Sequence, residues 1–182
     1  LCLSNSNITT AGFSSEYKEE IAKKVMLLGG KYQNSLEKDT TVVIAARSAS
    51  QKVYIASTNH IPVVTIEWIN ECFQKLIYIQ PDQYKILPFY GCKFTSSDLT
   101  LKQHKKISKI VTENGGEWSD TYDGKTTYLI AQALSNTQKI RIALQANVPI
   151  VKPEWIYRSA NSNLISPFDF LINWWCMSDQ KS

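Results

Sequence analysis

Apolar positions recur at helical spacing early in the chain. Within residues 14–30, Ile21, Val25 and Leu28 are separated by three or four positions, which predicts an amphipathic helix with one buried face. Serines at its start can cap this helix, and a glycine pair at its end can stop it.

The segments around this helix alternate between short apolar runs and further helical patterns. An uninterrupted apolar run of strand length is typical of a strand buried on both faces of a parallel sheet. This pattern predicts strands at residues 1–4, 31–33, 41–45 and 61–65, and helices over residues 14–30, from about residue 50, and over residues 66–76. Strands separated by helices indicate a small α/β unit with helices on both faces of its sheet.

The second half repeats this order of elements at a nearly constant distance. The matched features are residues 29–30 and 115–116, residues 40–45 and 126–131, Lys52 and Lys139, Pro62 and Pro149, and Trp68 and Trp155. The first two pairs are 86 residues apart and the other three are 87 residues apart. Chance does not keep one offset over separated features, so the chain is predicted to be two homologous units.

This duplication sets the expected domain boundaries. Repeat one is predicted at residues 1–76 and repeat two at residues 90–166. The intervening residues 77–89 are apolar and carry prolines, which predicts an ordered linker rather than a flexible tether. Residues 167–182 form an apolar C-terminal extension without a counterpart inside repeat one, and we expect it to pack as a strap on repeat two.

The composition narrows the range of partners. With 43% hydrophobic and 20% charged residues, the chain is typical of a soluble globular protein. The net charge of +4, from 20 Lys and Arg against 16 Asp and Glu, fits an anionic ligand but is well below that of a dedicated DNA-binding domain. No apolar run of membrane-spanning length and no lipidation motif occur, so no membrane partner is expected. Because the first residue is Leu, we interpret the chain as a fragment of a longer protein. We expect this fragment to be monomeric.

Few residues suit catalysis or metal binding. The four cysteines lie far apart without a CxxC pair, which argues against a zinc site and fits a reduced intracellular chain. His60 and His104 have no recognisable acid, nucleophile or metal partner in the sequence, and no catalytic motif occurs. We therefore expect no enzyme activity, no catalytic residue, no metal and no cofactor.

The doubled series of motifs resembles the BRCT family. Each half has a glycine pair after its first helix, a Thr-rich entry to a strand ending in Ile-Ala, a lysine leading the second helix and a tryptophan in the third. The complete series occurs twice in the correct order and covers nearly all of the chain. The whole chain is similar to a tandem BRCT pair, above all to pairs of multi-BRCT DNA damage checkpoint and replication scaffolds such as the topoisomerase-binding scaffold and its yeast relatives.

This resemblance implies both a fold and a function. The fold is α/β, with two BRCT repeats that each form a four-stranded parallel sheet flanked by three helices and that pack head to tail. Proteins with such pairs are mostly nuclear scaffolds of DNA damage signalling, repair and replication control, and many pairs bind peptides with phosphorylated Ser or Thr. We therefore expect a phosphorylated protein or peptide as the partner and the nucleus as the location.

The family's phosphate site has counterparts in both repeats. In its phosphopeptide-binding members, the phosphate is held by a Ser or Thr at the end of the first strand, the next backbone N–H, and a Lys at the start of the second helix. These positions correspond to Ser4, Asn5 and Lys52 in repeat one and to Ser97, Asp98 and Lys139 in repeat two. A helix N-terminus beside a lysine suits a phosphate dianion because the helix macrodipole is positive there.

The alignment of the first strand leaves alternatives in repeat one. Ser4 lies 25 residues before its glycine pair, whereas Ser97 lies 18 residues before the matching pair. The longer first loop makes Ser6, Thr9 or Thr10 possible substitutes for Ser4.

The charged residues near the two sites differ from those of the best-known phosphopeptide-binding pairs. Those pairs place an Arg three residues before the Lys, where this chain has Ala49 and an out-of-register Arg47. In repeat two the carboxylate of Asp98 would repel a phosphate unless it turns away. Lys102 and Lys105, close together on the first helix of that repeat, can add positive charge.

Two further interpretations compete with phosphopeptide binding. DNA would use the same lysines together with the basic run at residues 101–109. An unmodified partner would bind through the linker or the C-terminal extension. Trp68 and Trp155 invite assignment as stacking platforms, but each lies one turn into an apolar helix, and we assign both to the core.

Overall fold

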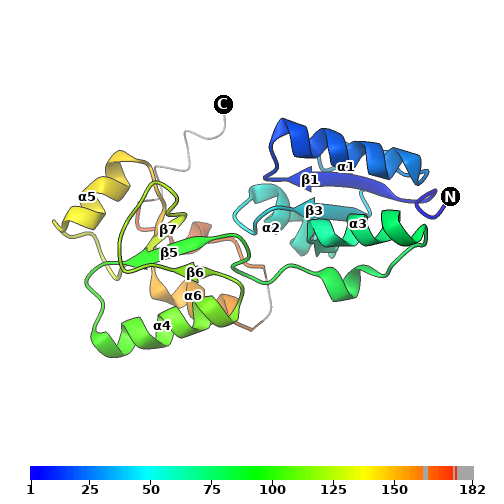
Figure 1. Cartoon of the computed structure of the whole chain (residues 1–182). Coiled ribbons are helices and arrows are strands. Elements are labelled where there is room, and N and C mark those ends of the chain that lie inside the picture. Colours follow the sequence, from blue (N-terminus) through cyan, green and yellow to red (C-terminus); the bar gives the residue numbers. More distant parts are fainter. Residues whose placement is uncertain (162–163, 174, 176–182) are drawn as a thin grey trace. The chain divides into compact units, whose positions relative to one another are not determined.

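The computed structural model describes residues 1–161, 164–173 and 175 of the chain. The chain divides into two compact units, Leu1–Ile86 (unit 1) and Leu87–Ser182 (unit 2). Many of their helices and strands are labelled in Figure 1. None of the described helices is both long enough and apolar enough to span a membrane.

Unit 1 is built on a parallel sheet with the spatial order β2-β1-β3-β4. Its strands are β1 (Asn7–Ala11), β2 (Lys31–Tyr32), β3 (Val42–Ala45) and β4 (Val63–Val64). Its helices are α1 (Ser15–Leu27), α2 (Gln51–Thr58), α3 (Ile66–Lys75) and the short 3-10 helix η1 (Pro81–Tyr84). Because all four strands are parallel, their carboxyl ends meet at one edge of the sheet.

Helices cover both faces of this sheet. Val42 and Ile44 of β3 lie in a buried core with residues of α1 and α3, two helices that contact each other. Successive strand residues point to opposite faces, so Val43 and Ala45 face the other side, where α2 packs against β3 and β4. Burial on both faces is the reason why this strand is an uninterrupted apolar run.

Unit 2 has the same architecture, with the strand order β6-β5-β7-β8 and parallel pairing throughout. Its strands are β5 (Lys93–Ser96), β6 (Glu117–Trp118), β7 (Tyr128–Ile130) and β8 (Ile150–Val151). Its helices are α4 (Leu101–Glu113), α5 (Gln138–Gln145), α6 (Pro153–Ser159) and the 3-10 helix η2 (Phe168–Phe170). The predicted α/β fold, a four-stranded parallel sheet with three α-helices in each unit, is confirmed.

The predicted first strand at residues 1–4 is wrong. The first strand is β1, and residues 2–5 form a turn before it. Leu3 is fully buried in the core of unit 1, and its N–H donates to the Leu28 carbonyl at 3.0 Å. The segment is therefore apolar because a residue of the turn fills the core, not because it forms a strand. Thr9 and Thr10 are buried in the strand itself, where β-branched residues fit well and hydrogen bonds satisfy their hydroxyls.

The tryptophan of each third helix holds the segment that follows it. The Trp68 indole N–H donates to the Ile79 carbonyl at 2.7 Å, and the Trp155 indole N–H donates to the Ile165 carbonyl at 2.8 Å. Both side chains are almost completely buried, as expected of core residues rather than stacking platforms.

The predicted linker and the C-terminal extension pack in equivalent ways. In unit 1, Val64 forms an antiparallel bridge with Lys85, and in unit 2 Val151 forms one with Leu171. The segment up to residue 86 is therefore part of unit 1, and residues 164–173 pack on unit 2. The remainder of the predicted extension, residues 174 and 176–182, lies outside the described residues.

Candidate functional site

The lysine at the start of α5 reaches over the carboxyl end of the central strand β5. Lys139 Nζ donates to the Ser96 carbonyl at 2.9 Å, the Thr95 hydroxyl at 3.1 Å and the Asp120 carbonyl at 2.7 Å. All three acceptors are neutral oxygens. Among the described residues, Lys139 forms no ion pair, so its charge stands at the sheet edge without a bonded carboxylate.

Unit 1 holds its lysine in the same way. Lys52 Nζ donates to the Thr10 carbonyl at 2.8 Å, the Thr9 hydroxyl at 3.2 Å and the Asn34 carbonyl at 3.2 Å. One threonine hydroxyl and two backbone carbonyls, from matched positions of the two units, hold both lysines. The sequence repeat therefore corresponds to a repeated placement of one cation.

Burial lowers the pKa of both lysines. For Lys52, partial desolvation lowers the pKa first and the nearby charge of Lys18 lowers it further. For Lys139, desolvation lowers the pKa, whereas the charge of Asp120 acts in the opposite direction. An incoming anion would stabilise either ammonium group, because it supplies the negative charge that the neutral oxygens lack.

Two hydroxyls meet beside Lys139. Ser97 directly follows β5, and its Oγ lies 2.8 Å from the Oγ1 of Thr137. Thr137 is the N-cap of α5, where its side chain accepts a hydrogen bond from the Ile140 N–H at 3.4 Å. Lys139 is the second residue of that helix. The end of β5 and the start of α5 therefore bring two hydroxyls and one ammonium group together, and we call this site, formed by Ser97, Thr137 and Lys139, the corner of unit 2.

Asp98 adds a backbone donor to this corner. Its φ of 59° is positive, and its N–H donates to no acceptor in the described part of the chain. Its carboxylate accepts a hydrogen bond from the Ser135 hydroxyl at 2.5 Å. The carboxylate that we expected to repel a phosphate is therefore hydrogen-bonded to Ser135.

The strand register identifies the equivalent corner of unit 1. Thr10 pairs with Ile44 as Ser96 pairs with Ile130, so Ala11 occupies the position of Ser97 and the following Gly12 that of Asp98. Gly12 has a positive φ of 81°, and its N–H also donates to no acceptor among the described residues. Unit 1 thus keeps the backbone donor and the lysine but lacks the hydroxyl.

The structure does not bring Ser4 and Asn5 to Lys52. Both lie in the turn before β1, at the amino end of the strand, whereas Lys52 binds the carboxyl end. The two alternatives in the strand are closer: Thr9 contacts Lys52, and the hydroxyl of Thr10 lies 2.9 Å from that of Tyr32. The misplaced first strand is the cause of the error for Ser4.

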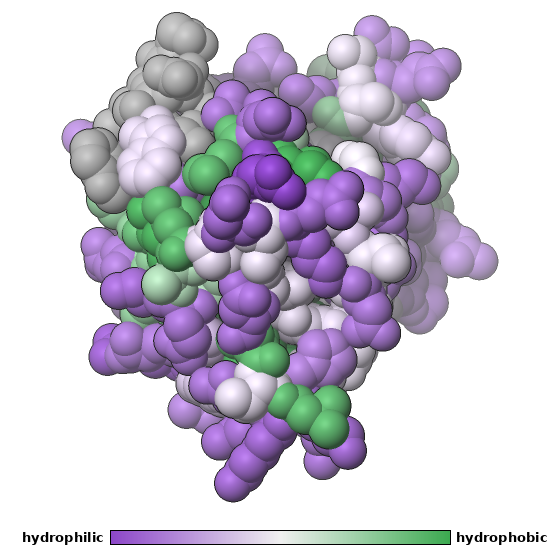
Figure 2. All heavy atoms as spheres, turned by 90° about the vertical axis from the view of Figure 1, so that its left-hand side faces the viewer, coloured by the Kyte–Doolittle hydropathy of each residue, from purple (hydrophilic) through white to green (hydrophobic). Residues whose placement is uncertain are grey.

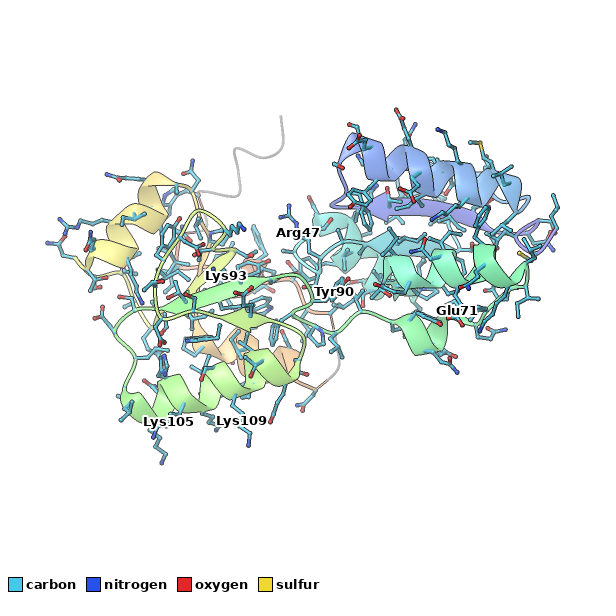
Figure 3. The ribbon with its side chains drawn as sticks, in the orientation of Figure 1. Arg47, Glu71, Tyr90, Lys93, Lys105 and Lys109 are labelled. Carbon is cyan, nitrogen blue, oxygen red and sulfur yellow. The ribbon has the colours of Figure 1, made fainter. Side chains whose placement is uncertain are left out.

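The out-of-register Arg47 of unit 1 lies over Gly12. A Cβ built on Gly12 would lie 3.4 Å from the Arg47 Cγ, and Figure 3 labels this arginine at the α2 end of unit 1. The Arg47 Nε would lie 3.7 Å from the same Cβ, so a second cation of unit 1 lies beside Gly12.

Sequence reasoning missed the role of Thr137. A Thr two residues before the Lys, at the predicted start of a helix, is a recognisable N-cap signal. What the sequence could not reveal is that this Thr also reaches the residue after the central strand. The two auxiliary lysines, Lys102 and Lys105, are exposed on α4. Among the described residues, no group of three or more His, Cys, Asp or Glu side chains could hold a metal ion.

The comparison with protein families identifies both units. The family described as BRCA1 C Terminus (BRCT) domain matches residues 1–73 and 85–160. The chain is similar to the S-M checkpoint control protein rad4 of Schizosaccharomyces pombe, with 23% identity over 157 residues, covering 81% of this chain and 24% of that protein. It is also similar to Protein ECT2 of Mus musculus, with 23% identity over 170 residues, covering 87% of this chain and 18% of that protein. The chain thus spans a quarter or less of the length of these relatives.

Solved structures share the fold of this chain. The crystal structure of Rad4 BRCT1,2 in complex with a Crb2 phosphopeptide has a TM-score of 0.74 and 22% identity, covering 92% of this chain and 97% of that one. The complex of Rad4 BRCT1,2 with a Mdb1 phosphopeptide has a TM-score of 0.75 and 22% identity, covering 91% and 96%. At this identity the likeness shows the fold. Together with the two family matches, it establishes that the chain belongs to the BRCT family and contains two BRCT domains in tandem.

Proposed function

We propose that this tandem BRCT pair is a protein interaction module that binds phosphorylated Ser or Thr of a partner protein. The module belongs to a longer nuclear scaffold of the DNA damage response, checkpoint signalling or replication, and it performs no catalytic step. The observation that carries this proposal is the corner of unit 2, where the Ser97 hydroxyl, the Asp98 N–H and the Lys139 ammonium group come together. Within the described part of the chain, that N–H donates to no acceptor.

These three donors match the chemistry of a phosphate monoester. A phosphoserine or phosphothreonine carries nearly two negative charges and three strong acceptor oxygens at neutral pH. Each hydrogen bond to a charged group contributes about 1.5 to 3 kcal/mol. Three such bonds, less the cost of ordering the peptide, correspond to a dissociation constant on the order of micromolar.

The solved relatives support this function. Rad4 BRCT1,2 was crystallised with phosphopeptides of Crb2 and Mdb1, and both structures cover almost the whole of this chain. The same scaffold therefore accommodates phosphopeptides in another protein. In this chain, the donors at the carboxyl edge of the unit 2 sheet supply the corresponding chemistry.

Unit 1 is the weaker site in this proposal. It offers the Lys52 ammonium group and the Gly12 N–H, but Ala11 supplies no hydroxyl where unit 2 has Ser97. Arg47 adds charge close to Gly12. We therefore expect unit 1 to bind phosphate mainly through charge and with lower affinity than unit 2.

Binding of degenerate phosphoserine and phosphothreonine peptide pools, with unphosphorylated pools as reference, tests the function. Lys139→Ala should weaken phosphate-dependent binding at least tenfold, because a charge-assisted bond of about 1.5 kcal/mol or more is lost. Lys52→Ala should weaken it less. Lys125→Ala removes an exposed lysine of unit 2 and serves as the control, with no expected change.

Two results would contradict the proposal. One is equal binding of phosphorylated and unphosphorylated pools. The other is phosphate-dependent binding that neither Lys139→Ala nor Lys52→Ala weakens while both variants keep the melting temperature of the wild type.

A further inference from the structure

The first helices of the two units occupy equivalent places. Both α1 and α4 contain 13 residues, and both follow the central strand of their sheet. At the offset of 86 residues, the buried Ile21 and Val25 of α1 correspond to the buried Ile107 and Val111 of α4. Residues on the two helix surfaces can therefore be compared position by position.

The exposed positions in the first half of these helices carry opposite charges. Glu16, Glu19 and Glu20 of α1 correspond to Lys102, Lys105 and Lys106 of α4. All six side chains are exposed, so neither set is required by the core. Three glutamates at these positions of α1 and three lysines at the matched positions of α4 give a difference of six charges.

The lysines of α4 are not explained by the stability of the helix. The N-terminus of a helix is the positive end of its macrodipole, so acidic residues are favourable there and lysines are not. The first turn of α1 contains Glu16, whereas the first turn of α4 has no acidic residue. A capping box between Thr100 and Gln103 stabilises the start of α4 instead.

Lys102 and Lys105 keep their charges available. Neither forms an ion pair within the described residues, whereas Lys109 lies 3.8 Å from Glu113 and Lys106 lies over the Tyr157 ring. Figure 3 shows Lys105 and Lys109 on the outer face of α4, away from the sheet. Figure 2 shows one face of the molecule, on which hydrophilic residues predominate.

These lysines are close to the phosphate corner of unit 2. Lys102 follows Ser97 by five residues, which limits the distance between their Cα atoms to about 18 Å even in an extended chain. The same helix also contacts the residue that holds Lys139: His104 Nε2 lies 3.0 Å from Asp120 Oδ1, and the Asp120 carbonyl accepts a bond from Lys139. An extended peptide held at the corner can therefore reach α4 with residues a few positions from its phosphoresidue.

We propose that unit 2 selects phosphopeptides with acidic residues within about four positions of the phosphoresidue, and that Lys102 and Lys105 determine this preference. This inference rests on the proposed function and adds the class of its substrate. Unit 1 carries glutamates at the matched positions and disfavours the same peptides.

The test compares three synthetic peptides: a phosphopeptide with acidic flanks, the same phosphopeptide with the acids replaced by Ser and Gly, and the unphosphorylated acidic peptide. Binding is measured by fluorescence anisotropy at low salt in a Lys52→Ala background, which isolates unit 2. We expect the acidic phosphopeptide to bind roughly tenfold more tightly than the neutral one, as exposed ion pairs allow. Lys102→Glu and Lys105→Glu, which install the residues of α1, should each remove most of that preference.

Lys106→Glu is the matched control, because it makes the same charge change on the same helix at the side chain that lies over Tyr157. It should change the preference much less. Lys102→Glu adds an acid to the first turn, so its melting temperature should not fall, and loss of folding cannot account for its effect.

The outcomes separate the two proposals. If neither phosphopeptide binds in preference to the unphosphorylated one, the proposed function fails. If both phosphopeptides bind equally well with phosphate dependence, the function stands and the acidic preference is overturned. If Lys102 and Lys105 instead control binding of duplex DNA, with a steep salt dependence and no preference among peptides, the basic surface serves nucleic acid and the inference is wrong.

Discussion

Each of the two sheets has a lysine ammonium group at its carboxyl edge, but only the sheet of unit 2 has a serine hydroxyl beside that lysine. Lys52 and Lys139 are each held by one threonine hydroxyl and two backbone carbonyls. The matched residue at the carboxyl end of the central strand is Ala11 in unit 1 and Ser97 in unit 2. The fold therefore determines where the lysine ammonium group lies, because strand end, loop and helix start all hold it. The neighbouring donor is a single side chain that each copy can change without altering the fold.

The cores show a similar contrast around a shared tryptophan. In unit 2, Trp155 packs against Phe89, Phe94 and Tyr128, with ring centroids 4.9 to 6.0 Å apart. At the corresponding places unit 1 has the aliphatic residues Leu3, Ile8 and Val42, all buried. The same architecture thus accepts an aromatic or an aliphatic interior, provided that the indole N–H reaches the carbonyl after the third helix.

The largest expected effect comes from removing these tryptophans. Trp68→Ala and Trp155→Ala should each lower the free energy of unfolding of their unit by about 3 to 5 kcal/mol. Trp155→Ala should cost more, because among the described residues Trp155 forms three aromatic pairs and Trp68 forms one, with Tyr78. Each such pair adds about 0.5 to 1.5 kcal/mol beyond the buried area. Urea unfolding followed by far-UV circular dichroism measures the loss, and hydrogen exchange with mass spectrometry locates it in one unit. A larger loss for Trp68→Ala would refute the role given to the aromatic core.

An exchange of the two edge residues should give a smaller effect. Ser97→Ala should weaken phosphopeptide binding by unit 2 by about 1.5 to 3 kcal/mol, the contribution of one hydrogen bond to a charged group. Ala11→Ser should strengthen binding by unit 1 by no more than that amount, because Ala11 is 95% buried and the new hydroxyl must find space. Calorimetry in the Lys52→Ala and Lys139→Ala backgrounds, respectively, isolates each unit. Equal affinities before and after both substitutions would show that the hydroxyl does not distinguish the units.

The smallest expected effect concerns the protonation of the two lysines. Both have a lowered pKa in the folded chain, so each makes an unfavourable contribution to stability below its folded pKa. That contribution disappears as the pH rises from the folded pKa to the unfolded value. NMR titration of the side-chain ammonium groups should therefore show Lys52 and Lys139 losing their protons at a lower pH than an unperturbed lysine.

Substitution of Lys18 sharpens this comparison. Lys18→Ala should raise the pKa of Lys52 and leave that of Lys139 unchanged, because the charge of Lys18 acts only on the former. A saturating phosphopeptide should raise the pKa of the lysine that it contacts. If the pKa of both lysines stays unchanged on binding, the phosphate lies elsewhere.

Much of this architecture is predictable from the sequence for a simple physical reason. Strands buried on both faces must be apolar throughout, and helices that cover them must place apolar residues on one face. Those requirements produce the apolar runs at residues 41–45 and 126–131, and the duplication of the unit produces the constant offset between them. The strong signal of β3 and β7, the positions of Lys52 and Lys139 and the burial of the tryptophans all follow from local pattern and repetition.

The first strand of unit 1 shows where pattern is insufficient. Residues 1–4 are apolar because Leu3 fills the core, and β1 looks polar because it contains two threonines. Whether a buried threonine is tolerated depends on partners distant in the chain: Lys52 for Thr9 and Tyr32 for Thr10. Such partners become neighbours only in the folded unit.

By itself, the sequence determined that the chain is two copies of one α/β unit and that each copy places a lysine at the start of its second helix. Only the tertiary structure decided which residues face those lysines. Parallel pairing of β1 with β3 and of β5 with β7 sets the register of the sheet edge, and that register puts Ala11 beside one lysine and Ser97 beside the other. Strand register depends on contacts between segments more than thirty residues apart, which no local pattern encodes.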